Sequence, residues 1–345
     1  MKKLKIGLVG AGNIAGSAHL PAYQKRTDID LVAIADLNLG RAQDAAKKYG
    51  VPHAYASVEE MLQKEDLDCV DICVWNGSHA PVAIAAAKAG KHVLCEKPMS
   101  LNVESALQME KAIREAGVTF MVAVPRRFHS EVTLLMDMVN QGKLGNIYYA
   151  KTAMIRRRGT PIGWFTDMRK SGGGPVLDIG VHCIDCTWYL MGRPKPVRVS
   201  ANVSHAIGNF QTKGVDRWKA LDSDVTAFDT EDSAAGAIHF ENGATMLFEV
   251  SWALNCPNQE YTQICGSLGG ATLNPLTIYT EENGYLTDNK PTTLTVNRYE
   301  VEIDHFLHCV RTGEKPIPSL EDGIMVQRML EGIYTSAKLG REVEI

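Results

Sequence analysis

Leu4–Gly16 reads LKIGLVGAGNIAG, and this stretch decides the fold of the first part of the chain. A short apolar run of strand type leads directly into the motif G-x-G-x-x-A, formed by Gly10, Gly12 and Ala15. In this motif the first glycine permits a tight turn, and the second lets a ligand approach the backbone. The small third residue lets a helix pack closely on the strand. The spacing therefore predicts a strand, a glycine turn and a helix in direct succession.

The helix after the turn would offer backbone N–H groups to an anion. We expect Asn13 and Ile14, together with the two glycines, to bind the pyrophosphate of a dinucleotide. A second apolar strand, 30–35, ends in Asp36, whose carboxylate can accept hydrogen bonds from both hydroxyls of the adenosine ribose. That carboxylate would repel a 2′-phosphate, and the next two residues carry no positive charge. The sequence therefore favours NAD over NADP.

The composition is typical of a globular protein with two domains. The chain has 345 residues, of which 45% are hydrophobic and 22% charged. Its formal net charge of −4 argues against a nucleic-acid partner and against an anionic membrane surface. No apolar stretch is long enough to span a bilayer. The eight cysteines show no regular spacing, which favours a reduced, cytoplasmic chain.

The pattern of apolar residues changes between two predicted domains. Strands and helices alternate through 1–123, which predicts an α/β Rossmann domain with a doubly wound parallel sheet, and Ser78 is expected to cap one of its helices. Residues 124–345 carry long alternating stretches such as 245–253, with a hairpin turn at Glu241–Gly243. They predict an α+β domain for substrate binding and oligomerisation, built on a large, mainly antiparallel open sheet.

An open sheet has a second face to cover. Phe248, Val250 and Trp252 alternate with other side chains along one predicted strand. We therefore expect the chain to form a homo-oligomer through that face of the sheet.

Two groups of residues at predicted strand ends face the site where ligands of parallel sheets bind. Glu96 and Lys97 directly follow one strand and would lie beside the nicotinamide. A lysine there can hydrogen-bond a substrate hydroxyl and stabilise the alkoxide that forms from it. Asn76 and His79 follow another strand and can reach the nicotinamide ribose, although both can equally cap the next helix.

A second candidate cluster lies in 171–185, which reads SGGGPVLDIGVHCID. Its three glycines let backbone and ligand come close. Asp178 and His182 are four residues apart and Asp185 follows three later, so the three are predicted to share one helical face. Oxidation of a secondary alcohol needs a base for the hydroxyl proton, and a neutral histidine suits that task near pH 7. A capping aspartate and a core histidine are the alternative interpretation.

The same helix permits a metal hypothesis. Asp178, His182, Asp185 and Cys186 lie at spacings that suit metal ligands, as in a metal-assisted lyase or hydrolase. Packing of an apolar helix more often explains two such cysteines, and we expect no metal.

Two further residues are candidates for substrate binding. Trp164 can stack on the C–H face of a sugar, or fill the core instead. Arg127 follows the last strand of the predicted Rossmann domain and can reach a substrate from there.

Taken in order, these motifs resemble the glucose–fructose oxidoreductase / inositol dehydrogenase family (Gfo/Idh/MocA). The resemblance covers nearly the whole chain, and AGKHVLCEKP at 89–98 is its most specific part. It implies a Rossmann domain, an open sheet used to form dimers, tetramers or larger oligomers, and hydride transfer between NAD(P) and a sugar or cyclitol carbon. It also implies that Lys97 assists proton transfer and binds substrate, that Asp178 binds and orients, and that His182 is the general base.

Within the family, GWFTD at 163–167 followed by three glycines looks like members that act on glucosides. Some of these oxidise the C3 hydroxyl of a glucosyl unit, so a glycoside or sugar 3-dehydrogenase is the favoured function. Inositol 2-dehydrogenase is the close competitor. A non-catalytic NAD-binding regulator is the alternative of another class, and the joint presence of Lys97, Asp178 and His182 argues against it.

Overall fold

The computed structural model describes residues 2–221 and 228–345, and its chain forms two compact units. No helix in this described part is long and apolar enough to cross a membrane. The first unit consists of Met1–Pro125 and Asn297–Gln327, and the second of Arg126–Val296 and Arg328–Ile345.

The first unit is built on a six-stranded sheet with the order β3-β2-β1-β4-β5-β6. Each neighbouring pair is parallel, so the predicted doubly wound sheet is confirmed. The C-terminal ends of these strands carry the glycine turn, Asp36 and Lys97. The strands are β1 (Leu4–Val9), β2 (Ile29–Ala35), β3 (His53–Tyr55), β4 (Cys69–Ile72), β5 (His92–Glu96) and β6 (Phe120–Ala123).

Several helices of the first unit begin at a polar cap. The side chains of Asn38 and Ser57 each accept a backbone N–H three residues later, and Asn102 forms a capping box with Ser105. The helices of this unit are η1 (Ala15–His19, a π-helical turn), α1 (Leu20–Gln24), α2 (Leu39–Tyr49), α3 (Val58–Lys64), α4 (Asn76–Lys88), α5 (Val103–Ala116) and α9 (Arg298–Thr312).

The expectation that Ser78 caps a helix is wrong. Helix α4 already begins at Asn76, and Trp75 is the N-cap residue, with an extended backbone and a side chain that does not cap the helix. The Ser78 N–H donates to the Trp75 carbonyl at 2.9 Å, so Ser78 lies inside the first turn.

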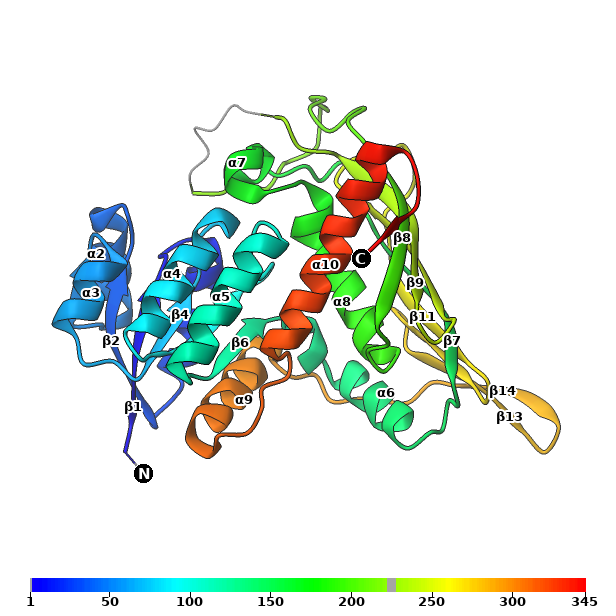
Figure 1. Cartoon of the computed structure of the whole chain (residues 1–345), viewed down its shortest axis with the longest axis horizontal. Coiled ribbons are helices and arrows are strands. Elements are labelled where there is room, and N and C mark those ends of the chain that lie inside the picture. The colour runs from blue at the N-terminus through cyan, green and yellow to red at the C-terminus, as the bar shows by residue number, and fades with distance from the viewer. Residues whose placement is uncertain (1, 222–227) are drawn as a thin grey trace. The chain divides into compact units, whose positions relative to one another are not determined.

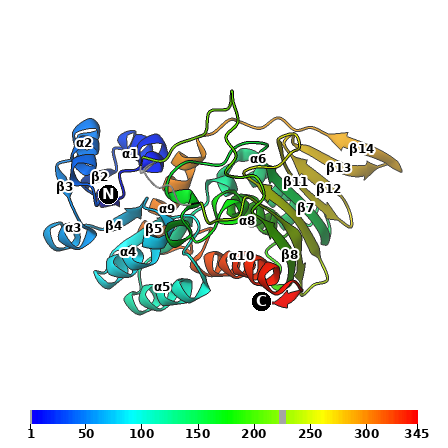
Figure 2. The same ribbon diagram turned by 90° about the horizontal axis from the view of Figure 1, so that it is seen from above.

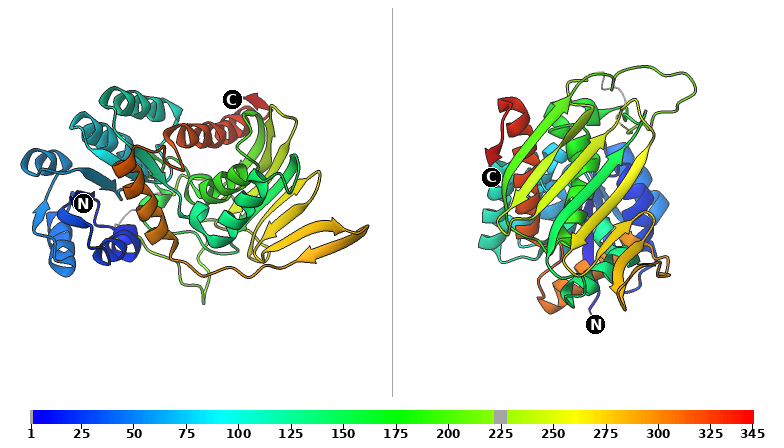
Figure 3. Two further views of the ribbon diagram at one scale, coloured as in Figure 1. Left: turned by 90° about the horizontal axis from the view of Figure 1, so that it is seen from below. Right: turned by 90° about the vertical axis from the view of Figure 1, so that its right-hand side faces the viewer.

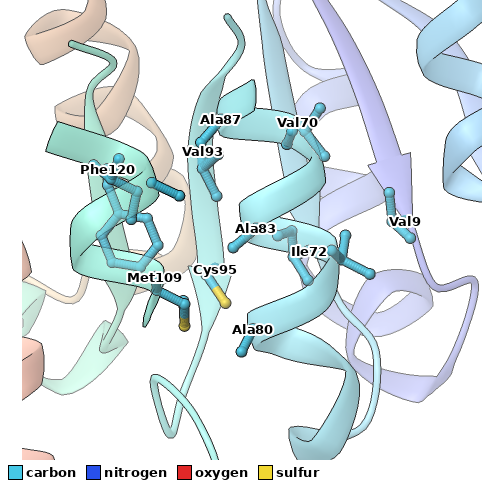
Figure 4. Close-up of a cluster of buried hydrophobic side chains, with 14 of the residues drawn as sticks. Val9, Val70, Ile72, Ala80, Ala83, Ala87, Val93, Cys95, Met109 and Phe120 are labelled. Atoms are coloured by element: carbon cyan, nitrogen blue, oxygen red, sulfur yellow. The ribbon is translucent and has the colours of Figure 1, made fainter. Parts of the chain in front are cut away.

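The core of the first unit packs α4 against the sheet through small side chains. Ala83 and Ala87 of α4 are fully buried in the same cluster as Val70 of β4 and Val93 of β5 (Figure 4). Because alanine adds little bulk, the helix can lie close to the strands. Helices α4 and α5 run side by side along this layer (Figure 1).

The second unit is built on a nine-stranded sheet with the order β14-β13-β12-β11-β7-β10-β9-β8-β15 (Figure 2). Only the β7–β10 pair is parallel among these neighbours, which confirms the mainly antiparallel sheet. Strands β9 and β10 form the hairpin predicted at Glu241–Gly243. The strands are β7 (Ile147–Ile155), β8 (Pro196–Ser204), β9 (Ser233–Phe240), β10 (Thr245–Ser251), β11 (Gln259–Gly266), β12 (Gly270–Leu273), β13 (Thr277–Glu282), β14 (Tyr285–Asn289) and β15 (Val343–Glu344).

Helices cover one face of this sheet, and Figure 3 shows the other face without a helix in front of it. Phe248, Val250 and Trp252 are buried on the helix-covered side, so they cannot form an oligomer surface. Half-buried Leu247 and Glu249 alternate with them and point to the open face instead. The remaining helical elements are η2 (Pro125–Phe128), α6 (Ser130–Asn140), η3 (Trp164–Thr166), α7 (Met168–Ser171), η4 (Val176–Gly180, a π-helical turn), α8 (Val181–Leu190) and α10 (Leu320–Leu339).

Candidate functional site

The glycine turn after β1 leaves room for a ligand at one of its glycines and not at the other. Gly10 has a φ of +95°, and a Cβ added there would collide with the Cys73 carbonyl. A Cβ added to Gly12 would meet no atom within 4 Å, so the backbone there is open. Asn13 and Ile14 begin the helix that follows, where N–H groups face outward from its N-terminus. The turn therefore fits the pyrophosphate of NAD.

Asp36 is held against this turn by its own hydrogen bonds. One carboxylate oxygen accepts the Ala11 N–H at 2.9 Å, and the other accepts the Asn38 N–H at 2.8 Å. The structure thus brings the acid and the glycine motif together, as the motif predicts. Arg41 lies nearby, with its Nη1 atom 3.6 Å from the carboxylate of Asp36.

A buried polar network in the first unit was missed by the sequence analysis. His19 ends η1 and is fully buried, with Nδ1 2.7 Å from the carboxylate of Asp71 and Nε2 3.0 Å from that of Glu96. Burial opposes the charged ring, but the Asp71 carboxylate outweighs it and raises the pKa of His19 well above its usual value. Glu96 also accepts the Lys97 N–H at 3.1 Å. The network therefore links the helix after the glycine turn to the residue that precedes Lys97.

Part of this network resembles a metal site in its composition. The ligand atoms of His19, Asp71 and Cys73 lie within 4.8 Å of one another. Both ring nitrogens of His19 already face carboxylates at hydrogen-bond distance, which leaves no lone pair for a metal. Burial raises the pKa of the Cys73 thiol to about 12, which disfavours the thiolate that a metal would need. Hydrogen bonding therefore accounts for the cluster.

Both ring nitrogens of His79 face backbone carbonyls. It is fully buried, with Nδ1 2.7 Å from the Pro98 carbonyl and Nε2 3.1 Å from the Val74 carbonyl. Burial lowers its pKa. The ring thus lies between the loops after β4 and β5, where a neutral imidazole donates its one N–H to one of these carbonyls, and we do not place His79 among the cofactor contacts. Asn76 is also buried and begins α4.

Lys97 is half-buried at the C-terminal end of β5. The adjacent Glu96 is buried, and the Lys97–Pro98 peptide bond is cis. Lys97 belongs to the first unit, whereas the other two proposed catalytic residues belong to the second.

Asp178 and His182 differ in burial from every neighbour on their helical segment. Residues 173–188 are all buried apart from these two, which are half-exposed. Asp178 lies in the π-helical turn η4, and His182 lies in the first turn of α8. Such π-helical turns occur frequently at functional sites. An acid and an imidazole are thus the only side chains that this segment presents outward.

Trp252, which the sequence analysis placed on a face expected to form a homo-oligomer, fixes one of these groups instead. The indole N–H of Trp252 donates to the Asp178 carboxylate at 2.9 Å. Trp252 is fully buried, so the donor is rigidly held at the end of β10. A buried indole N–H needs an acceptor, which is the signal that would have predicted such a partner.

Asp185 and Arg127 are bound to each other. The guanidinium of Arg127 donates to both carboxylate oxygens of Asp185, at 2.8 and 2.6 Å, and both residues are buried. The Arg127 guanidinium also lies 4.5 Å from the ring centroid of Tyr189. Asp185 is therefore not the third group of an exposed metal-binding face. Because Arg127 is bound to Asp185 and lies over the Tyr189 ring, we leave it out of the proposed substrate contacts.

Trp164 is half-exposed and belongs to an aromatic cluster. Its ring stacks on that of Phe165 at 3.9 Å, and Phe165 meets the ring of Trp218 edge-on at 5.2 Å. Trp218 is 50% exposed. The cluster offers an aromatic surface of the kind that packs on the apolar face of a sugar. The sequence analysis did not foresee Trp218.

The open glycine turn and the carboxylate beside it place the first unit among NAD-binding Rossmann domains, and the chain among nicotinamide-dependent oxidoreductases. Comparison with family models makes this specific. Residues 4–124 match the oxidoreductase family with an NAD-binding Rossmann fold, and residues 136–345 match the C-terminal alpha/beta domain of the same family. The chain belongs to this family, Gfo/Idh/MocA, and it binds NAD.

Individual relatives match over nearly the full length. D-glucoside 3-dehydrogenase of Escherichia coli (strain K12) is 34% identical over 348 residues, covering 99% of this chain and 97% of the relative. Myo-inositol 2-dehydrogenase of Thermotoga maritima is 26% identical, covering 93% and 92%. The structure of aldose-aldose oxidoreductase from Caulobacter crescentus, complexed with glycerol, is 26% identical with a TM-score of 0.83 and full coverage of both chains. The chain is an NAD-binding sugar or polyol oxidoreductase.

Proposed function

We propose that the enzyme oxidises a secondary hydroxyl of a sugar or glycoside, with C3 of a glucosyl unit as the favoured position. The observation that carries this proposal is the 34% identity, over 99% of the chain, to a protein named D-glucoside 3-dehydrogenase. The half-exposed Asp178 and His182 support it, because they supply the polar groups that an alcohol oxidation needs.

In the proposed reaction the C–H and O–H bonds of one carbinol both break, and a ketone forms. Gly10, Gly12, Asn13, Ile14 and Asp36 would hold NAD, which would supply the hydride acceptor. His182 removes the hydroxyl proton as the general base. Lys97 hydrogen-bonds the same oxygen and stabilises its developing negative charge.

Asp178 would bind a neighbouring hydroxyl and orient the sugar. Its carboxylate is already fixed by the Trp252 indole at 2.9 Å, so it need not be ordered when the substrate binds. Trp164 would pack on the apolar face of the ring.

Inositol oxidation is the second candidate function. It is supported by the similarity to a myo-inositol 2-dehydrogenase over 93% of the chain. Both substrates offer a ring of secondary hydroxyls, so the same acid–base groups would serve either.

A substrate screen tests these functions. Reduction of NAD is followed by absorbance with methyl glucosides, free sugars, myo-inositol and a methyl 3-deoxyglucoside. We expect turnover with methyl glucoside and none with its 3-deoxy analogue. Oxidation of the 3-deoxy compound would place the reaction at another carbon, and preference for myo-inositol would select the second function. If purified protein binds NAD but oxidises none of these compounds, the non-catalytic regulator becomes the better description.

The open face of the nine-stranded sheet is the proposed homo-oligomer surface. Four half-buried residues lie on it, namely Leu247, Glu249, Lys151 and Tyr261. Lys151 pairs with Glu249 at 3.7 Å and lies over the Tyr261 ring. We expect a dimer, tetramer or larger oligomer by light scattering, and a smaller particle for Leu247→Arg. An unchanged mass for that variant would rule out this face.

The eight cysteines are free thiols, with six of them buried. Together with the predicted lack of a disulfide framework, this supports a cytoplasmic location. Cell fractionation tests it, and recovery outside the cytoplasm would contradict it.

A further inference from the structure

The glycine turn of the second unit is held by two side chains from distant parts of the chain. Glu231, which is 1% exposed, lies just ahead of β9, and half-buried Tyr334 lies on α10. One carboxylate oxygen of Glu231 accepts the Gly174 N–H at 2.8 Å, and the other accepts the Val176 N–H at 3.1 Å. Tyr334 donates its hydroxyl to the second of these oxygens at 2.8 Å.

The same two residues occupy the space next to the glycines. A Cβ added to Gly173 would overlap the Tyr334 hydroxyl, and one added to Gly174 would overlap the backbone carbonyl of Glu231. The sequence predicted that these glycines admit a ligand. The groups that approach them instead belong to the protein, so the absence of a side chain serves packing here.

The held peptides lie immediately before the proposed catalytic pair. Val176 is the first residue of η4, and the Asp178 N–H donates to the Gly174 carbonyl at 3.0 Å. Helix α8, with His182 in its first turn, follows η4 directly. Because side chains of a helix rotate with its backbone, the start of η4 determines where Asp178 and His182 point.

Burying a carboxylate costs free energy unless it is fully hydrogen-bonded. Burial raises the pKa of Glu231, while the Gly174 N–H and the Tyr334 hydroxyl oppose that rise. Two N–H donors at the beginning of a helical segment are groups that a helix cannot satisfy itself. Glu231 supplies their acceptor in a fixed position, which a water molecule would not.

We infer that Glu231 and Tyr334 are positioning residues for Asp178 and His182, acting through the turn at Gly173 and Gly174. This inference rests on the proposed function, because it assigns the two residues a role in turnover. Neither residue touches the cofactor or the substrate in this proposal.

The first test compares Tyr334→Phe and Glu231→Gln with the wild type. Tyr148→Phe on β7 and Glu282→Gln on β13 are matched controls, because both side chains are exposed on the nine-stranded sheet away from the turn. Activity is expressed per NAD-binding site, so that unfolded protein is not counted. We expect kcat to fall about 10-fold or more in the two test variants, since a small misplacement of catalytic groups can cost up to about 10²-fold. The dissociation constant for NAD should stay within about 2-fold, because NAD is bound by the first unit.

A double-mutant cycle separates positioning from a structural role. If Tyr334 acts through His182, then Tyr334→Phe should lower kcat little further in a His182→Ala background. An additive loss, or an unchanged kcat per NAD-binding site in the single variants, overturns the inference.

Hydrogen exchange of 173–182 provides a readout that does not need turnover. Both test variants should exchange faster than wild type in this segment, and the controls should not. If the wild type oxidises none of the screened compounds, the proposed function has failed. Unchanged exchange in folded Tyr334→Phe would overturn the inference by itself, whatever the substrate.

Discussion

The two units use the same local design for opposite purposes. In each, a glycine turn leads into a π-helical turn, η1 after Gly12 and η4 after Gly174. In the first unit the turn is open, because a Cβ on Gly12 would meet nothing within 4 Å. In the second the turn is filled by Glu231 and Tyr334. An open turn presents backbone to a ligand, whereas a filled turn fixes the side chains that follow it.

In the proposed function the open turn binds the cofactor, and the filled turn fixes residues that take part in the chemistry. Removing the side chain of Lys97 or His182 should therefore impair turnover without preventing NAD binding, and this is the largest effect that we expect. Lys97→Ala and His182→Ala should each lower kcat by about 10²- to 10⁴-fold, the usual contribution of proton transfer by a positioned side chain. NAD binding, measured by titration of protein fluorescence, should remain. The matched controls are Lys88→Ala on α4 and His239→Ala on β9. Normal rates in both test variants would show that the roles are wrongly assigned.

The next largest effect concerns the interior of the first unit. His19→Ala would leave the Asp71 and Glu96 carboxylates buried without the imidazole between them. We expect the free energy of unfolding to fall by about 3–5 kcal/mol, as when one member of a buried ion pair is removed. Denaturant unfolding measures this, with exposed His53→Ala as the control. A loss no larger than that of the control would mean that the network contributes little to stability. The first unit would then lack a buried side-chain network comparable to the one that Glu231 and Tyr334 form in the second.

The first unit was the more predictable one from sequence because its signals are local. The glycine motif, its strand and Asp36 all lie within the first 36 residues. The strands and helices around them show the usual spacing of apolar residues and the usual polar residues at helix starts. Its interior network was not predicted, since His19 meets partners 52 and 77 residues away. A visible signal did exist. Asp71 is a charged residue inside an apolar strand, and such residues are almost always paired.

In the second unit the sequence indicated the candidate site residues themselves, but not the residues that hold them in place. Asp178 and His182 stand out through their spacing, but Glu231 lies 57 residues from Gly174 and 103 from Tyr334. No local pattern selects those partners, because tertiary packing brings them together. The same reason explains why Arg127 was assigned to substrate although it pairs with Asp185. The return of Asn297–Gln327 to the first unit also has no local signal.

Glu302 gives a third test, through the pH dependence of stability in the first unit. It is fully buried on α9, and neither carboxylate oxygen has a hydrogen-bond partner in the described structure. Burial, reinforced by the charge of Glu96, raises the pKa of Glu302 well above its ordinary value of 4.5. Above pH 4.5 the unfolded chain ionises at this residue while the folded chain stays protonated, so stability is lost as the pH rises toward the folded pKa.

The Gln side chain of Glu302→Gln cannot ionise. The midpoint of thermal unfolding of this variant should therefore rise relative to that of the wild type as the pH increases from 4.5 to 8. The relief should grow by at most about 1.4 kcal/mol per pH unit, the linkage slope of a single titrating group. The control is Glu300→Gln, a neighbour on the same helix that is less deeply buried. A constant difference across this range would show that Glu302 finds a partner in solution.

The smallest expected effect tests whether the open turn can be altered without disturbing the filled one. Asp36 accepts two backbone N–H groups and lies 3.6 Å from Arg41. In Asp36→Ser the repulsion of a 2′-phosphate is removed and Arg41 is released to bind it. We expect kcat/KM with NAD to fall about 10-fold and the ratio of NADP to NAD activity to rise by at least as much, about 1.4 kcal/mol each. Adding Arg41→Ala should remove the gain for NADP. The KM for the sugar should not change in either variant, because the groups proposed to bind it apart from Lys97, namely Asp178, His182 and Trp164, belong to the second unit. A change in sugar KM of similar size would mean that the two turns are coupled, and the division of labour between them would have to be abandoned.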